Sequence, residues 1–224
     1  MININEWLGI LSEKLSEKFK ERLLFVGLHG SYSRREATES SDIDTIVILD
    51  YVDINDLRAY RSIIATMPEK EKACGFISGK DVINNWPKYE IFQLTQETKT
   101  FYGSLKGLLP EVTREDIIDN AKNNVANLYH LTCHQYTYGN INCRELELKN
   151  AYKTIFFILQ VVYYLRSGTY IYTKKELLPL LKDEEKQLLT ISMNWQMFAG
   201  EREDDPEKFY NFIIKWGSNI LKEF

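Results

Sequence analysis

The sequence predicts an α+β fold, in which an N-terminal half of mixed strands and helices precedes a helical bundle. Two observations support this prediction. Short apolar runs at residues 23–30 and 43–49 are typical of buried strands. Beyond Pro110, apolar residues recur at three- and four-residue intervals, which is the period of helices. The change of pattern predicts two domains, residues 1–107 and 108–224.

The N-terminal half is expected to be a mixed sheet with flanking helices. A helix opens the chain, because apolar residues recur at helical spacing from Ile4 to Phe19. Four strands are expected over residues 23–30, 43–49, 72–78 and 89–95. A further helix is expected over residues 53–67, with Asp53 as its N-cap.

Helix start signals follow one another in the C-terminal half. Thr113 and Asp116 resemble the start of a first helix, and a second is expected over residues 144–166. Residues 173–176, T-K-K-E, form a capping box for a third. The pair at 205–206, Asp-Pro, begins a last helix with proline at its first position.

Composition and charge narrow the class of protein. Hydrophobic residues make up 44% of the chain and the net charge is −4, which argues against a broad nucleic-acid surface. The apolar run at 154–165 is too short to cross a bilayer, so no membrane is expected. The three cysteines are odd in number and form no CxxC pair, which favours a cytoplasmic location.

The stretch HGSYSRREATESSDID, residues 29–44, combines features of a phosphate site. Gly30 permits a sharp turn at the end of a strand, and Ser31 adds a hydroxyl. A helix beginning near Ser33 would direct its dipole at an anion, and Arg34 adds positive charge. The order of these residues predicts a phosphate cradle.

Two aspartates close the same stretch at the entrance of an apolar strand. Asp42 and Asp44 share one face, because side chains alternate along a strand. Two carboxylates so close repel each other unless a cation joins them. Magnesium prefers oxygen ligands and shares them with substrate phosphates, so the pair predicts one or two Mg²⁺ ions.

The segment G-S-Y-S-R-R-E-A-T-E-S-S-D-I-D-T-I-V resembles the signature of the DNA polymerase beta-like nucleotidyltransferase superfamily. It is similar to the small bacterial aminoglycoside and lincosamide nucleotidyltransferases. The resemblance implies that Gly30, Ser31 and Arg34 hold the phosphates of a nucleoside triphosphate and that Asp42 and Asp44 bind Mg²⁺. Many members carry glycine where this chain has Arg35, a departure expected to alter the turn but to keep the chemistry.

The resemblance also implies a third acid on a neighbouring strand, as metal ligand or base. Glu90 is the first candidate, because it enters the strand expected over 89–95. Asp81 and Glu97 are the alternatives. A solvated glutamate at a strand end explains Glu90 equally well.

The helical half offers further candidates. Lys149 and Lys153 lie one turn apart and could reach a triphosphate, although a solvated helix face beside Glu145 is the favoured explanation. Glu145 and Glu147 are candidate bases on the acceptor side. A zinc site at His130, Cys133 and His134 is disfavoured against helix packing, because no second ligand pair supports it.

The expected activity is magnesium-dependent transfer of a nucleoside monophosphate, AMP from ATP in the first instance, with release of pyrophosphate. The acceptor would be a hydroxyl of a small molecule such as an aminoglycoside or lincosamide antibiotic. One alternative is an antitoxin-like enzyme that modifies a protein hydroxyl. Another is a nucleotide-binding regulator without turnover, against which the intact Asp42 and Asp44 argue. Association into a homodimer is left open.

Overall fold

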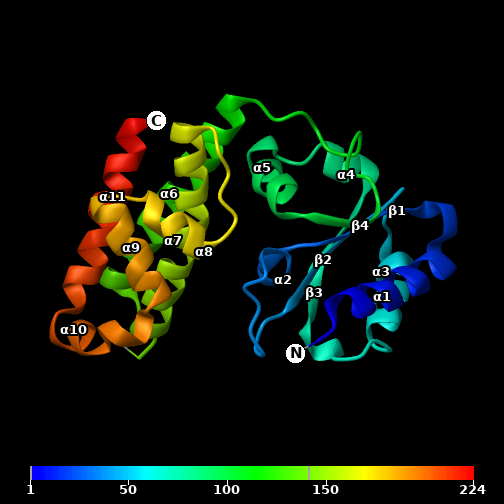
Figure 1. Cartoon of the computed structure of the whole chain (residues 1–224), viewed down its shortest axis with the longest axis horizontal. Coiled ribbons are helices and arrows are strands. Elements are labelled where there is room, and N and C mark those ends of the chain that lie inside the picture. The colour runs from blue at the N-terminus through cyan, green and yellow to red at the C-terminus, as the bar shows by residue number, and fades with distance from the viewer. Residues whose placement is uncertain (1, 141) are drawn as a thin grey trace. The chain divides into compact units, whose positions relative to one another are not determined.

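The computed structural model describes residues 2–140 and 142–224 and is drawn in Figure 1. It divides into two compact units, Met1–Val112 and Thr113–Phe224. The first unit contains a mixed sheet with helices and the second is helical. The predicted α+β class is therefore confirmed, while the bounds 1–107 and 108–224 stay a prediction for the domains.

A four-stranded mixed sheet forms the centre of the first unit. Its strands are β1 (Leu23–Leu28), β2 (Ile43–Leu49), β3 (Ala73–Gly79) and β4 (Lys99–Gly103). Their order across the sheet is β3-β2-β1-β4, with β1 antiparallel to both of its neighbours and β2 parallel to β3. The functional stretch connects the two central strands, β1 and β2.

Among the described residues, five helices belong to this unit, and two of them begin at a side-chain cap. The five are α1 (Ile4–Phe19), α2 (Gly30–Arg34), α3 (Ile54–Ile64), α4 (Lys80–Asn84) and α5 (Lys88–Glu97), with 3₁₀ turns η1 (Lys20–Arg22) and η2 (Lys70–Lys72). Asp53 caps α3 in a capping box with Asp56, as its place before the helix predicts. Asn3 caps α1 in a similar way.

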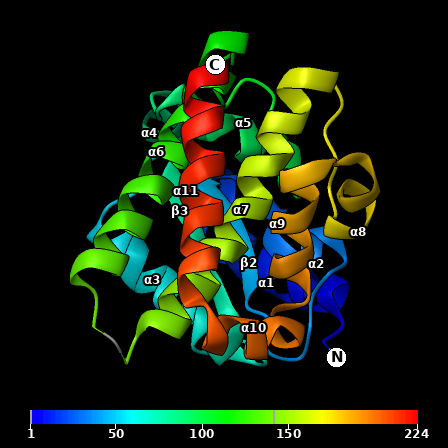
Figure 2. The same cartoon turned by 90° about the vertical axis from the view of Figure 1, so that its left-hand side faces the viewer.

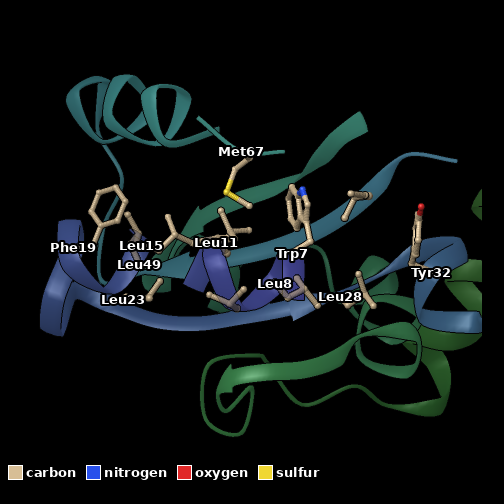
Figure 3. Close-up of a cluster of buried hydrophobic side chains, with 13 residues drawn as sticks. Trp7, Leu8, Leu11, Leu15, Phe19, Leu23, Leu28, Tyr32, Leu49 and Met67 are labelled. Atoms are coloured by element: carbon tan, nitrogen blue, oxygen red, sulfur yellow. The ribbon is translucent and has the colours of Figure 1, made fainter. Parts of the chain in front are cut away.

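The strands bury apolar side chains on both faces of the sheet. Figure 3 shows the first layer, in which side chains of α1, including Leu8, Leu11 and Leu15, pack against the strands together with Met67. Val47 of β2 belongs to this layer, whereas the neighbouring Ile46 packs on the opposite side with Ile83 and Ile91 of α4 and α5. Because side chains alternate along a strand, Asp44 shares the face of Ile46.

The predicted strand over residues 89–95 is wrong, because this segment is part of α5. Its two adjacent buried residues, Ile91 and Phe92, fit one side of a helix, and the hydroxyl of Thr95 donates to the carbonyl of Ile91 one turn earlier (2.8 Å). The fourth strand is β4 instead. All five of its residues are exposed, so it lacks the apolar alternation that identifies a strand in sequence.

The second unit is a bundle of helices. Its elements are α6 (Arg114–Tyr138), α7 (Arg144–Ser167), α8 (Lys174–Leu177), η3 (Leu178–Leu180), α9 (Asp183–Met193), η4 (Trp195–Phe198), α10 (Ala199–Asp204) and α11 (Pro206–Glu223). Figure 2 shows α7, α9 and α11 beside one another, and α6 packs against both α7 and α11. The predicted helix starts at Thr113 and Asp205 are confirmed, and Thr113 forms a capping box with Asp116. Among the helices of the described residues, none is long and apolar enough to span a bilayer.

Candidate active site

The turn between β1 and α2 brings Gly30 against Asp44. The amide of His29 donates to the carbonyl of Asp44 (2.8 Å), and the chain then turns through Gly30 at a φ of +66°. A Cβ added at Gly30 would lie 2.1 Å from Oδ2 of Asp44. Glycine is therefore required here for two reasons. It tolerates the positive φ, and it leaves the space that the Asp44 carboxylate occupies.

Helix α2 is a single short turn. It begins at Gly30, and Arg35 ends it in the left-handed region at a φ of 61°. The amide of Glu36 closes the end by donating to the carbonyl of Ser31 (2.9 Å). The predicted helix beginning at Ser33 and continuing to Glu39 is thus wrong in its bounds, because the left-handed residue interrupts it.

The two aspartates stand at the start of β2, two residues apart. Asp42 is exposed and Asp44 is half-buried, while Ile43 between them is fully buried in the layer beneath α1. The predicted sharing of one face by the two carboxylates agrees with this alternation. Ser31, half-buried at the first turn of α2, completes the set next to Gly30.

Cys74 of β3 lies beside this pair. The parallel register places Cys74 opposite Asp44, and its side chain is exposed. Partial burial, together with the negative charge and a hydrogen bond of Asp44, raises the pKa of the Cys74 thiol. Strand β3 itself contains no acidic residue, so the register position next to Asp44 is taken by a thiol.

The carboxylates fit a hard cation that completes its shell with other oxygens. Within residues 2–140 and 142–224, no three His, Cys, Asp or Glu side chains group closely enough to hold a metal by themselves. Asp42 and Asp44 could therefore supply two of the oxygen ligands that Mg²⁺ prefers, leaving positions for water and phosphate.

His29 is a neighbour of the site that sequence reasoning missed. Its Nδ1 is 3.2 Å from the hydroxyl oxygen of Thr98. Burial lowers the pKa of the imidazole, against the opposing charges of Glu97 and Asp44. Burial thus favours the neutral form of His29 at the point where the chain enters α2.

Arg34 is engaged within the protein. Its Nη1 pairs with a carboxylate oxygen of Glu97, and its Nε lies 3.3 Å from Oε2 of Glu36. The side chains of Arg34 and Glu97 are 8% and 2% exposed. Contact of Arg34 with a phosphate stays a prediction, but the guanidinium already has a buried partner in Glu97.

The candidates for a third acid lie on helices. Glu90 is exposed on α5, where its Oε2 accepts a hydrogen bond from the indole Nε1 of Trp86 (2.6 Å). Asp81 is exposed on α4. The prediction of Glu90 depends on a strand over residues 89–95, and this segment is helical. Glu90 is therefore not among the residues that the structure places around Asp44.

The residues singled out in the helical half lie on α7. Lys149 and Lys153 are one turn apart on it. Glu145 accepts hydrogen bonds from the indole of Trp195 (2.9 Å) and from Nη2 of Arg202 (2.7 Å), and the Arg202 guanidinium carbon lies 3.8 Å from the centre of the Trp195 ring. Burial opposes ionisation of Glu145, but these hydrogen bonds and the charge of Arg202 outweigh it and lower its pKa. A carboxylate so stabilised is a poor general base.

Glu145 is expected to stabilise the helical unit instead. We expect Glu145→Ala to lower the free energy of unfolding by about 1 kcal/mol, because the Arg202 guanidinium, 4% exposed, loses a carboxylate that is itself 61% exposed. In the control Glu201→Ala, which breaks a more exposed pair with Lys208, the loss should stay below ~0.5 kcal/mol. Urea unfolding measures both. Because the pKa is lowered, this stabilisation is present above the usual value near 4.5 and is lost as the pH falls through the lower folded value.

Comparison with known proteins identifies the first unit. Residues 8–106 match the nucleotidyltransferase domain family. This part of the chain is a nucleotidyltransferase domain. It contains the whole of the sheet, the Gly30-Ser31 turn and both aspartates. The class of chemistry is therefore nucleotidyl transfer, as the resemblance in the sequence implied.

A solved structure extends the likeness beyond the nucleotidyltransferase domain. The chain is similar to a spectinomycin adenyltransferase from Enterococcus faecialis, whose structure was determined with ATP and spectinomycin. The identity is 14%, the TM-score is 0.61, and the match covers 97% of this chain and 98% of the other. At this identity the likeness shows a shared fold, helical unit included. The search of curated proteins found no match.

Proposed function

We propose that the protein is a magnesium-dependent adenylyltransferase that acts on a hydroxyl of a small molecule. The hydroxyl oxygen forms a bond to the α-phosphorus of ATP, and the bond from that phosphorus to the bridging oxygen breaks. The hydroxyl proton passes to solvent, and the electron pair of the broken bond leaves with pyrophosphate. This reaction needs positioned charge around the triphosphate rather than a covalent intermediate on the enzyme.

The observation that carries the proposal is the contact between Gly30 and Asp44. It places a glycine-serine turn directly against a carboxylate of the pair on β2, inside a nucleotidyltransferase domain. A phosphate held at the turn would therefore lie next to the carboxylates. Neither feature alone is specific, but the two together favour a metal-bound triphosphate.

Each residue has a stated role in this proposal. Gly30 allows the triphosphate to approach the backbone, and Ser31 donates its hydroxyl to a phosphate oxygen. Asp42 and Asp44 bind and orient the cation. Magnesium, when bound, neutralises charge on the phosphates and lowers the barrier to departure of pyrophosphate. The proposal also includes Glu90 as a third acid, Arg34 as a phosphate contact, and Lys149 and Lys153 as triphosphate ligands.

The donor and acceptor are inferred from the neighbour. Its structure contains ATP and spectinomycin, and its fold is shared over nearly the whole chain. We therefore favour ATP as the donor and an aminoglycoside-type or lincosamide antibiotic as the acceptor, with drug resistance as the biological role. The odd number of cysteines also suits a reducing cytoplasm, where such drugs act.

The test is magnesium-dependent release of pyrophosphate from each of the four ribonucleoside triphosphates. Spectinomycin, several aminoglycosides and a lincosamide serve as acceptors, and α-labelled ATP reports where the nucleotide goes. Reactions without magnesium, without acceptor and with the Asp44→Ala variant are the controls. Release that requires ATP, magnesium, one drug and Asp44 is the expected result.

Other results would redirect the proposal. Label on a protein band instead of a drug would favour the protein-modifying alternative. Tight binding of nucleotide without any release of pyrophosphate would favour the regulator. Binding of no nucleotide at all would overturn the proposal.

Cys74 gives a chemical probe of the same site. We expect N-ethylmaleimide to inactivate the enzyme, because a bulky group on this exposed thiol would occupy the space beside Asp44. Inactivation should be faster at alkaline pH, because the raised pKa of the Cys74 thiol limits its thiolate form. ATP with magnesium should slow inactivation. A Cys74→Ser variant should keep its activity after the same treatment, although Cys133 and Cys143 remain to be modified. Equal inactivation of that variant would locate the sensitive thiol elsewhere.

A further inference from the structure

The segment from Glu97 to Lys99 holds helix α2 from the side. The hydroxyl of Ser33, a buried residue of α2, donates to the backbone carbonyl of Glu97 (2.7 Å). The ammonium of Lys99 donates to the carbonyl of Ser33. Thr98, between them, contacts His29 just before α2. Three consecutive residues thus fasten one short helix.

The Glu97 side chain adds a buried ion pair to these contacts. Its carboxylate pairs with Arg34, the last residue of α2, and both side chains are more than nine-tenths buried. A buried pair of this kind has a definite geometry, because removing either partner leaves an uncompensated charge. Helix α2 is therefore fixed at its C-terminal end by charge and near its middle by Ser33.

This fixation matters for the turn at the other end of α2. Glycine has little preference between positive and negative φ, so contacts around α2 must select the φ of +66° at Gly30, which also packs against the carboxylate of Asp44. The helix spans only five residues, so a shift at Arg34 is transmitted to Gly30 over little more than one turn. The placement of the turn against Asp44 depends on contacts made far away in sequence.

We infer that Glu97 is a positioning residue for nucleotidyl transfer, which acts through Arg34 by holding the Gly30-Ser31 turn in place. The inference rests on the proposed function of that turn. It assigns to Glu97 a different task from that of a third metal ligand, because the Glu97 side chain is directed to Arg34 and buried with it.

The test compares Glu97→Gln, Arg34→Gln and the double variant. We expect each single variant to raise the KM for ATP about tenfold and to lower kcat, because the turn loses its fixed position. The double variant should be no worse than either single one, because both remove the same interaction. Magnesium dependence should be unchanged. Glu71→Gln, which changes an exposed carboxylate of the same unit, is the matched control.

A measurement independent of turnover accompanies the kinetics. Amide hydrogen exchange over residues 30–36 should become faster in Glu97→Gln while α1 keeps its protection. Wild-type kinetics with unaltered exchange, or additive losses with a shifted magnesium requirement, would overturn the positioning role. Wild-type protein without nucleotidyl transfer would instead refute the proposed function, so the two failures are distinguishable.

Discussion

Replacing Asp44 by asparagine is expected to reduce kcat/KM by about a thousandfold or more, because the isosteric amide removes a charge that the cation requires. The side chain keeps its shape against Gly30, so the loss would report on charge alone. Pyrophosphate release at saturating ATP and varied magnesium measures it. An Asp44→Asn enzyme that turned over at the wild-type rate would exclude the carboxylate pair from the mechanism.

The same substitution should not weaken the metal-free protein. Asp42 and Asp44 repel each other in the absence of a cation, so neutralising one of them is expected to leave the melting temperature unchanged or raise it by a few degrees. Asp119→Asn, at an exposed position of α6, is the control and should change neither quantity. A large fall in melting temperature would mean that Asp44 is a structural residue.

Gly30→Ala is expected to reduce kcat/KM by about a hundredfold, since the new methyl group displaces the Asp44 carboxylate. The added Cβ would stand 2.1 Å from Oδ2 of Asp44, well inside contact distance. Backbone strain at a φ of +66° adds a stability cost of about 1 kcal/mol. Steady-state kinetics and urea unfolding separate the two effects.

Gly107→Ala is the matched control for this substitution. Gly107 has a φ of +79° in the same unit, and an added Cβ there meets nothing within 4 Å. The control should therefore show the loss of stability without the loss of activity. Equal kinetics for Gly30→Ala and Gly107→Ala would contradict the steric argument for Asp44.

The central part of the site could be predicted because it is local in sequence. Gly30, Ser31, Asp42 and Asp44 lie within fifteen residues that join two adjacent apolar strands, as the fold confirms. The period of a strand predicts which face the aspartates share. Their closeness to the glycine turn then follows from the pairing of β1 with β2.

The rest of the site depends on contacts that no local pattern records. The register that sets Cys74 opposite Asp44 is a property of two parallel strands separated by a helix. The partner of Arg34 lies 63 residues further along the chain. Glu97 looked like a rival for a metal ligand, because an acid near a strand end gives no sign of the arginine that it meets after folding.

The prediction of secondary structure failed where the apolar pattern of the sequence does not match the backbone pairing of the sheet. Residues 89–95 have a short run that suits either a strand or a helix, and packing of Ile91 and Phe92 against the sheet decides for the helix. Strand β4 is an edge strand whose side chains are exposed, so only its backbone pairing with β1 defines it. Helix starts could be predicted more reliably, because Asp53 and Thr113 both cap helices at the positions expected from the sequence.

The left-handed Arg35 has a consequence for how this sequence could change. Its φ of 61° is a conformation that costs an ordinary residue about 1 kcal/mol and glycine almost nothing. Arg35 is thus an exposed cationic residue at a position where glycine would give a more stable fold. Laboratory evolution selected for thermal stability alone should replace Arg35 by glycine. Selection for both stability and catalytic activity should retain Arg35 only if its charge assists the reaction.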